Sequence, residues 1–139
     1  MKHLISITLL TLLVLVGCTS ELDRCMEANT GNLENNLKEK NQKFRDEHVG
    51  ENGYFVEGWR VAYRDFEANV LTDFERELGE CTGDKIDTYM DKHNLDFSVQ
   101  SEVDEYMAKT EEFEVSCEKS VPLERVKRAT KICNEQGIY

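Results

Sequence analysis

Apolar residues recur every three or four positions along most of this chain, and Pro122 is its only proline. This spacing places apolar side chains along one side of an α-helix. The longest such stripe runs from Phe55 to Cys81, with charged residues between its members, and it predicts a long central helix. The pattern therefore favours an all-α fold, a small bundle of four to five helices.

Shorter stripes before and after the central one predict further helices. An N-terminal helix is expected to begin at Leu22, to be interrupted at residues 30–32 and to continue to a loop at residues 48–53. After Gly79 and Gly83, a stripe over residues 86–93 predicts a third helix. These elements fill the first two thirds of the chain.

The last third of the chain predicts two more helices. Residues 98–117 keep the helical spacing, and Ser98 is the expected cap. Pro122 suits the first turn of a fifth helix over residues 123–136, and Gly137 suits a Schellman stop. The expected apolar face of this last helix consists of Leu123, Val126, Thr130 and Cys133.

The first apolar run has the layout of a bacterial export signal. A short basic start precedes residues 4–14, which are apolar and too short to span a bilayer. The tetrad that follows, Leu15, Val16, Gly17 and Cys18, resembles the lipobox of bacterial lipoproteins. The resemblance implies that residues 1–17 are a signal peptide that is removed and that Cys18 becomes a diacylglycerol-bearing, acylated N-terminus. An ordinary secretory signal or a membrane anchor is the alternative.

The lipobox resemblance sets the expected location. It makes residues 18–21 a lipidated tether and residues 22–139 a single helical domain. About seven residues separate the lipid from Cys25, a reach of about 25 Å, so the domain and its partner are expected at the membrane. Thr19 follows the lipidated cysteine, which resembles lipoproteins exported to the outer membrane of Gram-negative bacteria.

The charge of the chain argues against nucleic acid as a partner. The formal net charge is −11 at pH 7, and a polyanion is repelled by such a surface. The densest basic cluster is expected to be a solvated helix face; it consists of Arg125, Lys127, Arg128 and Lys131. A basic or neutral partner remains compatible with this charge.

The chain has five cysteines, and lipid on Cys18 would leave four that can pair. The other four, Cys25, Cys81, Cys117 and Cys133, then predict two disulfides in an exported domain. A continuous fifth helix would hold Cys117 about 20 Å from Cys133, too far to bond. Of the two remaining pairings, Cys25–Cys133 with Cys81–Cys117 is preferred. No Cys-x-x-Cys or His-x-x-x-His spacing favours zinc.

Residues with catalytic or metal-binding chemistry are present without an arrangement that specifies a role. The two histidines of the expected domain, His48 and His93, belong to a polar loop and to a helical stripe. The closely spaced aspartates Asp84, Asp87, Asp91 and Asp96 do not match an EF-hand loop in any register. No catalytic residue, metal or cofactor is therefore expected.

One aromatic run allows two interpretations. Tyr54, Phe55 and Trp59 lie between or beside Gly53 and Gly58 at the start of the central stripe. Aromatic side chains of this kind serve as anchors in protein interfaces. The same residues begin the best apolar stripe of the chain, so the sequence favours core over interface.

These observations favour a non-enzymatic binding or accessory lipoprotein of the bacterial cell envelope. Two other functions stay open. One is a structural subunit of an envelope complex, and the other is a small periplasmic enzyme whose site is assembled from scattered acidic residues and His93.

Overall fold

The structure is a computed structural model that describes residues 19–139, and these residues form five α-helices. The helices are α2 (Glu21–Thr30), α3 (Leu37–His48), α4 (Trp59–Asn69), α5 (Asp73–His93) and α6 (Gln100–Glu135). Among the described residues the only β-type pairing is an isolated bridge between Val49 and Phe55. The predicted all-α class is confirmed.

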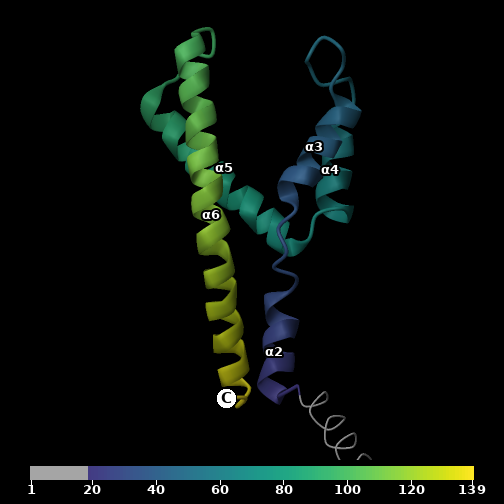
Figure 1. The fold of residues 1–139 in the computed structure, drawn as a ribbon, viewed down its shortest axis with the longest axis vertical. Helices are drawn as coiled ribbons and strands as arrows, with labels where there is room; N and C mark the ends of the chain where they lie inside the picture. The colour runs from purple at the N-terminus through teal and green to yellow at the C-terminus, as the bar shows by residue number, and fades with distance from the viewer. Residues whose placement is uncertain (1–18) are drawn as a thin grey trace, which may run out of the picture.

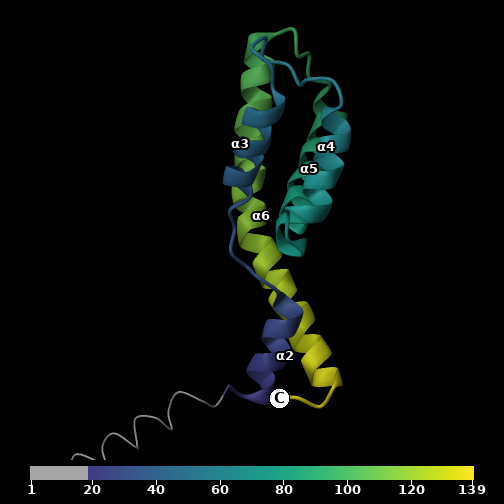
Figure 2. The same cartoon turned by 90° about the vertical axis from the view of Figure 1, so that its right-hand side faces the viewer.

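The helices form a fork (Figure 1). The 36 residues of α6 extend over about 54 Å at 1.5 Å per residue. Helix α2 packs beside the C-terminal half of α6 and α5 beside its N-terminal half, while the α3–α4 hairpin diverges from them (Figures 1 and 2). We call α2, α5 and α6 the body, the α3–α4 hairpin the arm, and the end of the body where α2 begins the base.

Two disulfides tie the body together. Cys25 of α2 is bonded to Cys133 near the end of α6, and Cys81 of α5 is bonded to Cys117 in the middle of α6, both with Cα atoms 6.0 Å apart. The two predicted disulfides are therefore present, in the pairing preferred from the sequence. Each helix of the body is covalently attached to another.

The expected central helix over residues 55–81 is wrong, because the chain breaks between α4 and α5. Thr72 caps α5: its hydroxyl oxygen accepts a hydrogen bond from the Glu75 amide, and the Glu75 carboxylate accepts one from the Thr72 amide. This capping box starts a new helix at Asp73. Phe55, the first residue of the stripe, lies outside any helix.

The separate third helix is also wrong, because α5 runs without a break through Gly79 and Gly83 to His93. Two glycines in a helix interior cost about 1 kcal/mol each. Tertiary contacts offset that cost: Leu78 is packed in the core, and Cys81, between the glycines, is held to α6 by its disulfide.

The fourth and fifth predicted helices are one helix, with Pro122 in the interior of α6. The expected cap is wrong as well: Val99 occupies the N-cap position, while the Ser98 hydroxyl donates to the Asp96 carboxylate at 2.7 Å. Core residues lie on both sides of the proline, with Cys117 and Val121 before it and Ala129 after it. This burial favours a continuous helix.

The apolar face predicted for the end of α6 is corrected in part. Leu123, Val126 and Thr130 are exposed, whereas Cys133 is buried. The buried side instead consists of Cys117, Val121, Ala129 and Cys133, spaced at multiples of four, because this side faces α5 and α2 in turn. The predicted Schellman stop is confirmed: Gly137 has a φ of 77°, and the Ile138 amide donates to the Cys133 carbonyl oxygen at 3.0 Å.

The core consists of two clusters of buried side chains. The body cluster contains Phe74, Leu78, Cys117 and Val121, and the arm cluster contains Phe44, Phe66 and Leu71. Leu37, at the start of α3, packs against both clusters. The arm therefore has apolar packing of its own and meets the body at one apolar contact point.

Candidate functional site

Residues 49–58 connect α3 to α4 at the far end of the arm (Figure 1). They form a short turn in which Val49 pairs with Phe55 and the Gly50 amide donates to the Tyr54 carbonyl oxygen at 2.8 Å. The backbone of the turn is thus hydrogen-bonded. Residues 51–58 of the turn are exposed.

The predicted aromatic run lies at this end of the arm and is exposed. Tyr54 is 75% exposed, Phe55 40% and Val56 43%, while Trp59 at the start of α4 is half-buried. The preference for core is therefore wrong for Tyr54 and Phe55, because α4 begins only at Trp59 and the preceding residues belong to the turn. We call Tyr54, Phe55, Val56 and Trp59 the arm tip.

Ring contacts fix the arm tip to the arm. Phe55 stacks on Trp59 with ring centroids 4.4 Å apart, Trp59 meets the edge of Tyr63 at 6.4 Å, and Tyr63 meets Phe44 of the arm cluster at 5.4 Å. Burial, aided by the neighbouring Glu67 carboxylate, raises the pKa of Tyr63, so its hydroxyl stays neutral at physiological pH. Successive ring contacts therefore connect the exposed Phe55 to the buried Phe44 of the arm cluster.

A buried ion pair holds the arm to the body. The Lys40 ammonium of α3 lies 2.8 Å from the Glu75 carboxylate of α5 and also donates to the Val70 carbonyl oxygen. The Glu75 side chain is only 1% exposed. Burial raises the pKa of Glu75, but hydrogen bonds from Lys40 and Thr72 outweigh it and bring the pKa below its ordinary value. Glu75 therefore stays ionised as a structural anion.

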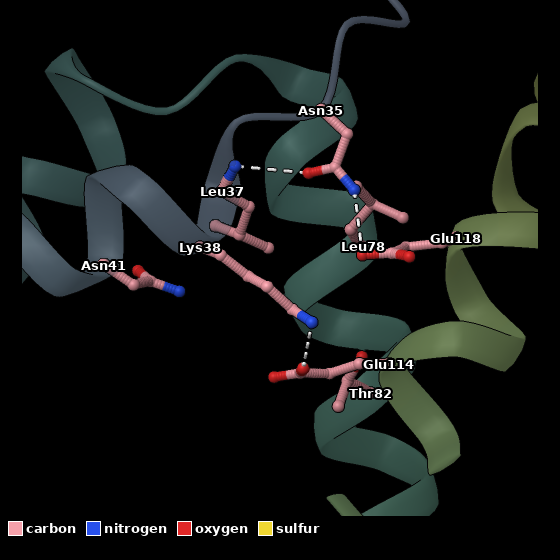
Figure 3. A pocket seen from close by; sticks show the side chains of 8 residues that line it. All are labelled: Asn35, Leu37, Lys38, Asn41, Leu78, Thr82, Glu114 and Glu118. Carbon is pink, nitrogen blue, oxygen red and sulfur yellow. Dashed lines mark hydrogen bonds and ion pairs between the residues drawn. The ribbon is translucent and has the colours of Figure 1, made fainter. Parts of the chain in front are cut away.

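Polar contacts complete the junction between arm and body (Figure 3). The Asn35 amide group donates to the Glu118 carboxylate of α6 at 3.2 Å, and the Lys38 ammonium lies 3.4 Å from the Glu114 carboxylate. The cavity between these side chains has a volume of about 30 Å³. It can hold water but no substrate, so we interpret it as part of the junction.

The basic cluster of α6 is only partly the solvated face that was expected. The Arg125 side chain is 11% exposed, its Nε donates to the Thr30 carbonyl oxygen at 2.9 Å, and its guanidinium lies over the Phe74 ring. Glu77 of α5 pairs with Arg125 at 3.4 Å and with Arg128 at 2.8 Å. These contacts join α2, α5 and α6, so this arginine stabilises the body.

Among residues 19–139, the histidines contact aromatic rings and are not grouped with acidic side chains around an enclosed pocket. His48 stacks on Phe44, and the exposed His93 stacks on Tyr89 beside an open groove of about 440 Å³ between α5 and α6. In that groove the Tyr89 hydroxyl donates to Glu105, which raises the pKa of Tyr89. Within residues 19–139 no group of three or more histidine, cysteine or acidic side chains is placed to hold a metal ion.

The lipidation site Cys18 and the signal peptide over residues 1–17 lie outside the described residues. In the described part, no helix combines the length and the apolar character that crossing a bilayer requires. Comparisons of the chain with protein-family models, with curated proteins and with solved structures return no match. The geometry of the chain itself therefore carries the functional argument.

Sequence reasoning missed two features. The Lys40–Glu75 pair could have been found in part, because Thr72 and Glu75 have the Thr-x-x-Glu spacing of a capping box. The exposed side chains Phe97 and Val99, in the turn between α5 and α6, were missed because Val99 belonged to the predicted helical stripe and Phe97 preceded that stripe without a pattern of its own.

Proposed function

We propose that this chain is a lipid-anchored lipoprotein of the bacterial cell envelope that binds another envelope protein through the arm tip and catalyses no reaction. One observation carries the proposal. The exposed rings of Tyr54 and Phe55 belong to the turn between α3 and α4, and this turn lies at the opposite end of the fork from the start of α2, three residues after Cys18 (Figure 1).

The position of the anchor determines which end of the molecule would face the membrane. A lipid on Cys18 would hold the base at the membrane, since α2 begins only three residues later. The body would then extend over about 54 Å, the length of α6. An arm tip at the other end can meet a partner well beyond the reach of the tether alone. An outer-membrane location in a Gram-negative cell fits Thr19 at the position after the lipid.

The arm tip has the chemistry of a binding surface. Tyrosine and tryptophan side chains are enriched among the residues that dominate binding energy. Here Tyr54 is exposed on a hydrogen-bonded turn, and the half-buried Trp59 lies beside it at the start of α4. An enzyme needs a titratable group in an enclosed pocket. The buried carboxylate Glu75 is instead paired with Lys40 in the junction, which favours binding over catalysis.

The binding proposal is tested with the protein extracted from membranes with its lipid intact. We expect one stoichiometric partner to co-purify with the wild type and to be lost from the double variant Tyr54→Ala, Phe55→Ala. Leu123→Ala is the matched control, because Leu123 is an exposed apolar residue on α6, away from the arm. It should retain the partner.

Other outcomes contradict the proposal. Equal recovery of the partner from the wild type and the tip variant would exclude the arm tip as the binding surface. A large assembly of many components would favour a structural subunit. Recovery of no partner would favour the enzyme.

The anchor is tested separately with Cys18→Ser. The wild type should incorporate a fatty-acid analogue and fractionate with membranes, because acyl chains contribute about 0.8 kcal/mol per buried CH₂. The variant should incorporate none. Equal labelling of both proteins would refute the lipobox interpretation.

A further inference from the structure

A second exposed apolar surface lies at the turn between α5 and α6. Phe97 is 52% exposed and Val99 40%. Phe97 meets the edge of the half-buried Tyr106 ring on the first turns of α6, with centroids 5.3 Å apart. We call Phe97, Val99 and Tyr106 the turn tip.

Hydrogen bonds order the backbone of the turn tip. The Asp96 carboxylate accepts from the Ser98 amide at 2.9 Å and from the Ser98 hydroxyl at 2.7 Å. The Asp96 amide in turn donates to the Glu102 carboxylate on α6. Phe97, between two residues fixed in this way, is presented to solvent by an ordered turn.

Both tips lie at the same end of the molecule. Figures 1 and 2 show the turn between α3 and α4 and the turn between α5 and α6 at the top, with the base at the bottom. A surface that approaches this end along α6 therefore meets both prongs of the fork.

Charge distinguishes this end from the base. Residues 44–60, around the arm tip, carry four acidic residues and two arginines, and residues 89–107, around the turn tip, carry five acidic residues and one lysine. Residues 19–30 and 119–139, which make up the base, together carry six basic residues and five acidic ones. The end with the exposed rings is thus the acidic end, which favours a basic partner surface.

We propose that the arm tip and the turn tip bind together to one protein partner, whose surface offers two apolar pockets rimmed by lysine or arginine. This inference rests on the proposed function and adds the second contact and the chemistry of the partner. Because both contacts belong to one molecule, the second forms at high effective concentration, and loss of either tip should weaken binding by about 100-fold or more.

The test places a photo-crosslinking phenylalanine analogue at single positions of the lipid-anchored chain in cells. Positions 54 and 97 should give an adduct of the same mass, and position 123, on the exposed side of α6, should give none. In the background Tyr54→Ala, Phe55→Ala, the adduct at position 97 should fall to a few per cent of its yield, because the two contacts are linked. Position 99 is a second probe of the turn tip.

Each alternative outcome identifies what fails. Adducts from position 54 but not from 97 or 99, or adducts of different mass, overturn the two-point contact and leave the proposed function standing. An adduct of twice the chain mass identifies a second copy and overturns the proposed partner. Absence of adducts at 54, 97 and 99 overturns the inference and the proposed function together. An equal yield at 123 also overturns the inference.

Discussion

The body and the arm are held in place by different means. In the body, the disulfides Cys25–Cys133 and Cys81–Cys117 attach α2 and α5 to α6. The arm has no disulfide, and its position depends on the small cluster of Phe44, Phe66 and Leu71 and on the ion pair of Lys40 with Glu75.

This difference separates a covalently fixed support from a part that only noncovalent contacts keep in place. Local opening is easiest where few apolar contacts are buried. The arm should therefore open before the body does, and the arm tip belongs to the part that can adjust to a partner. Four perturbations, from the largest expected effect to the smallest, test this comparison.

Removal of the disulfide at the base should have the largest effect. The double variant Cys25→Ala, Cys133→Ala opens a loop with a sequence separation of 108 residues, which should lower the free energy of unfolding by about 5 kcal/mol. Because Cys25 is the only buried residue of α2, amide hydrogen exchange should accelerate most in α2. A larger acceleration in the arm than in α2 would contradict the division into body and arm.

Phe66→Ala should weaken the arm by about 4 kcal/mol, since Phe66 is a buried member of the arm cluster. Amide exchange in α3 and α4 should rise to nearly unprotected rates while α6 remains protected. Val61→Ala is the control on the same helix, because Val61 is exposed, and it should change stability by less than about 0.5 kcal/mol. Simultaneous loss of protection in α6 would mean that the two regions unfold as one.

Lys40→Met leaves the buried Glu75 carboxylate without its cation and should cost about 3 kcal/mol, measured by denaturant unfolding. The double variant Lys40→Met, Glu75→Gln should recover much of this loss, because the uncompensated charge is gone. No recovery in the double variant would show that Lys40 acts through packing rather than through the ion pair.

Acid should loosen the arm through the same pair. The pKa of Glu75 is lowered in the folded protein. The stability that ionised Glu75 contributes is therefore complete above its ordinary pKa near 4.5 and is lost as the pH falls through the lower pKa of the folded state. Exchange in α3 and α4 should therefore rise below about pH 4. Glu75→Gln should remove this component, and an unchanged pH profile in that variant would exclude Glu75 as its source.

The sequence predicted the features that depend on local chemistry. Helical periodicity gave the all-α class, the even set of cysteines gave the two disulfides, and Gly137 gave the C-terminal cap. Helix boundaries were predicted poorly. Gly79, Gly83 and Pro122 suggested breaks, but contacts between α5 and α6 maintain both helices, and such contacts are not visible in a local pattern.

The candidate site was predicted in part for a similar reason. Tyr54, Phe55 and Trp59 were identified as a group, but whether they lie in the core depends on where α4 begins. The apolar stripe predicted one helix from Phe55 to Cys81, whereas the chain forms two helices that begin at Trp59 and at Asp73. Phe97 was not identified, because its place in the turn tip depends on the turn between α5 and α6 lying at the same end of the fork as the turn between α3 and α4. The exposure of the aromatic run and the position of Phe97 both depend on how the helices pack, which a local sequence pattern does not show.

The central claim is that the arm tip is exposed at the end of the fork that faces away from the anchoring membrane. Trp59 is the only tryptophan of the chain, so its fluorescence reports on the arm tip directly. In vesicles that carry the lipidated protein, acrylamide in the water should quench Trp59, and brominated acyl chains in the bilayer should not. Quenching by the brominated lipid would place the arm tip on the membrane and contradict the account.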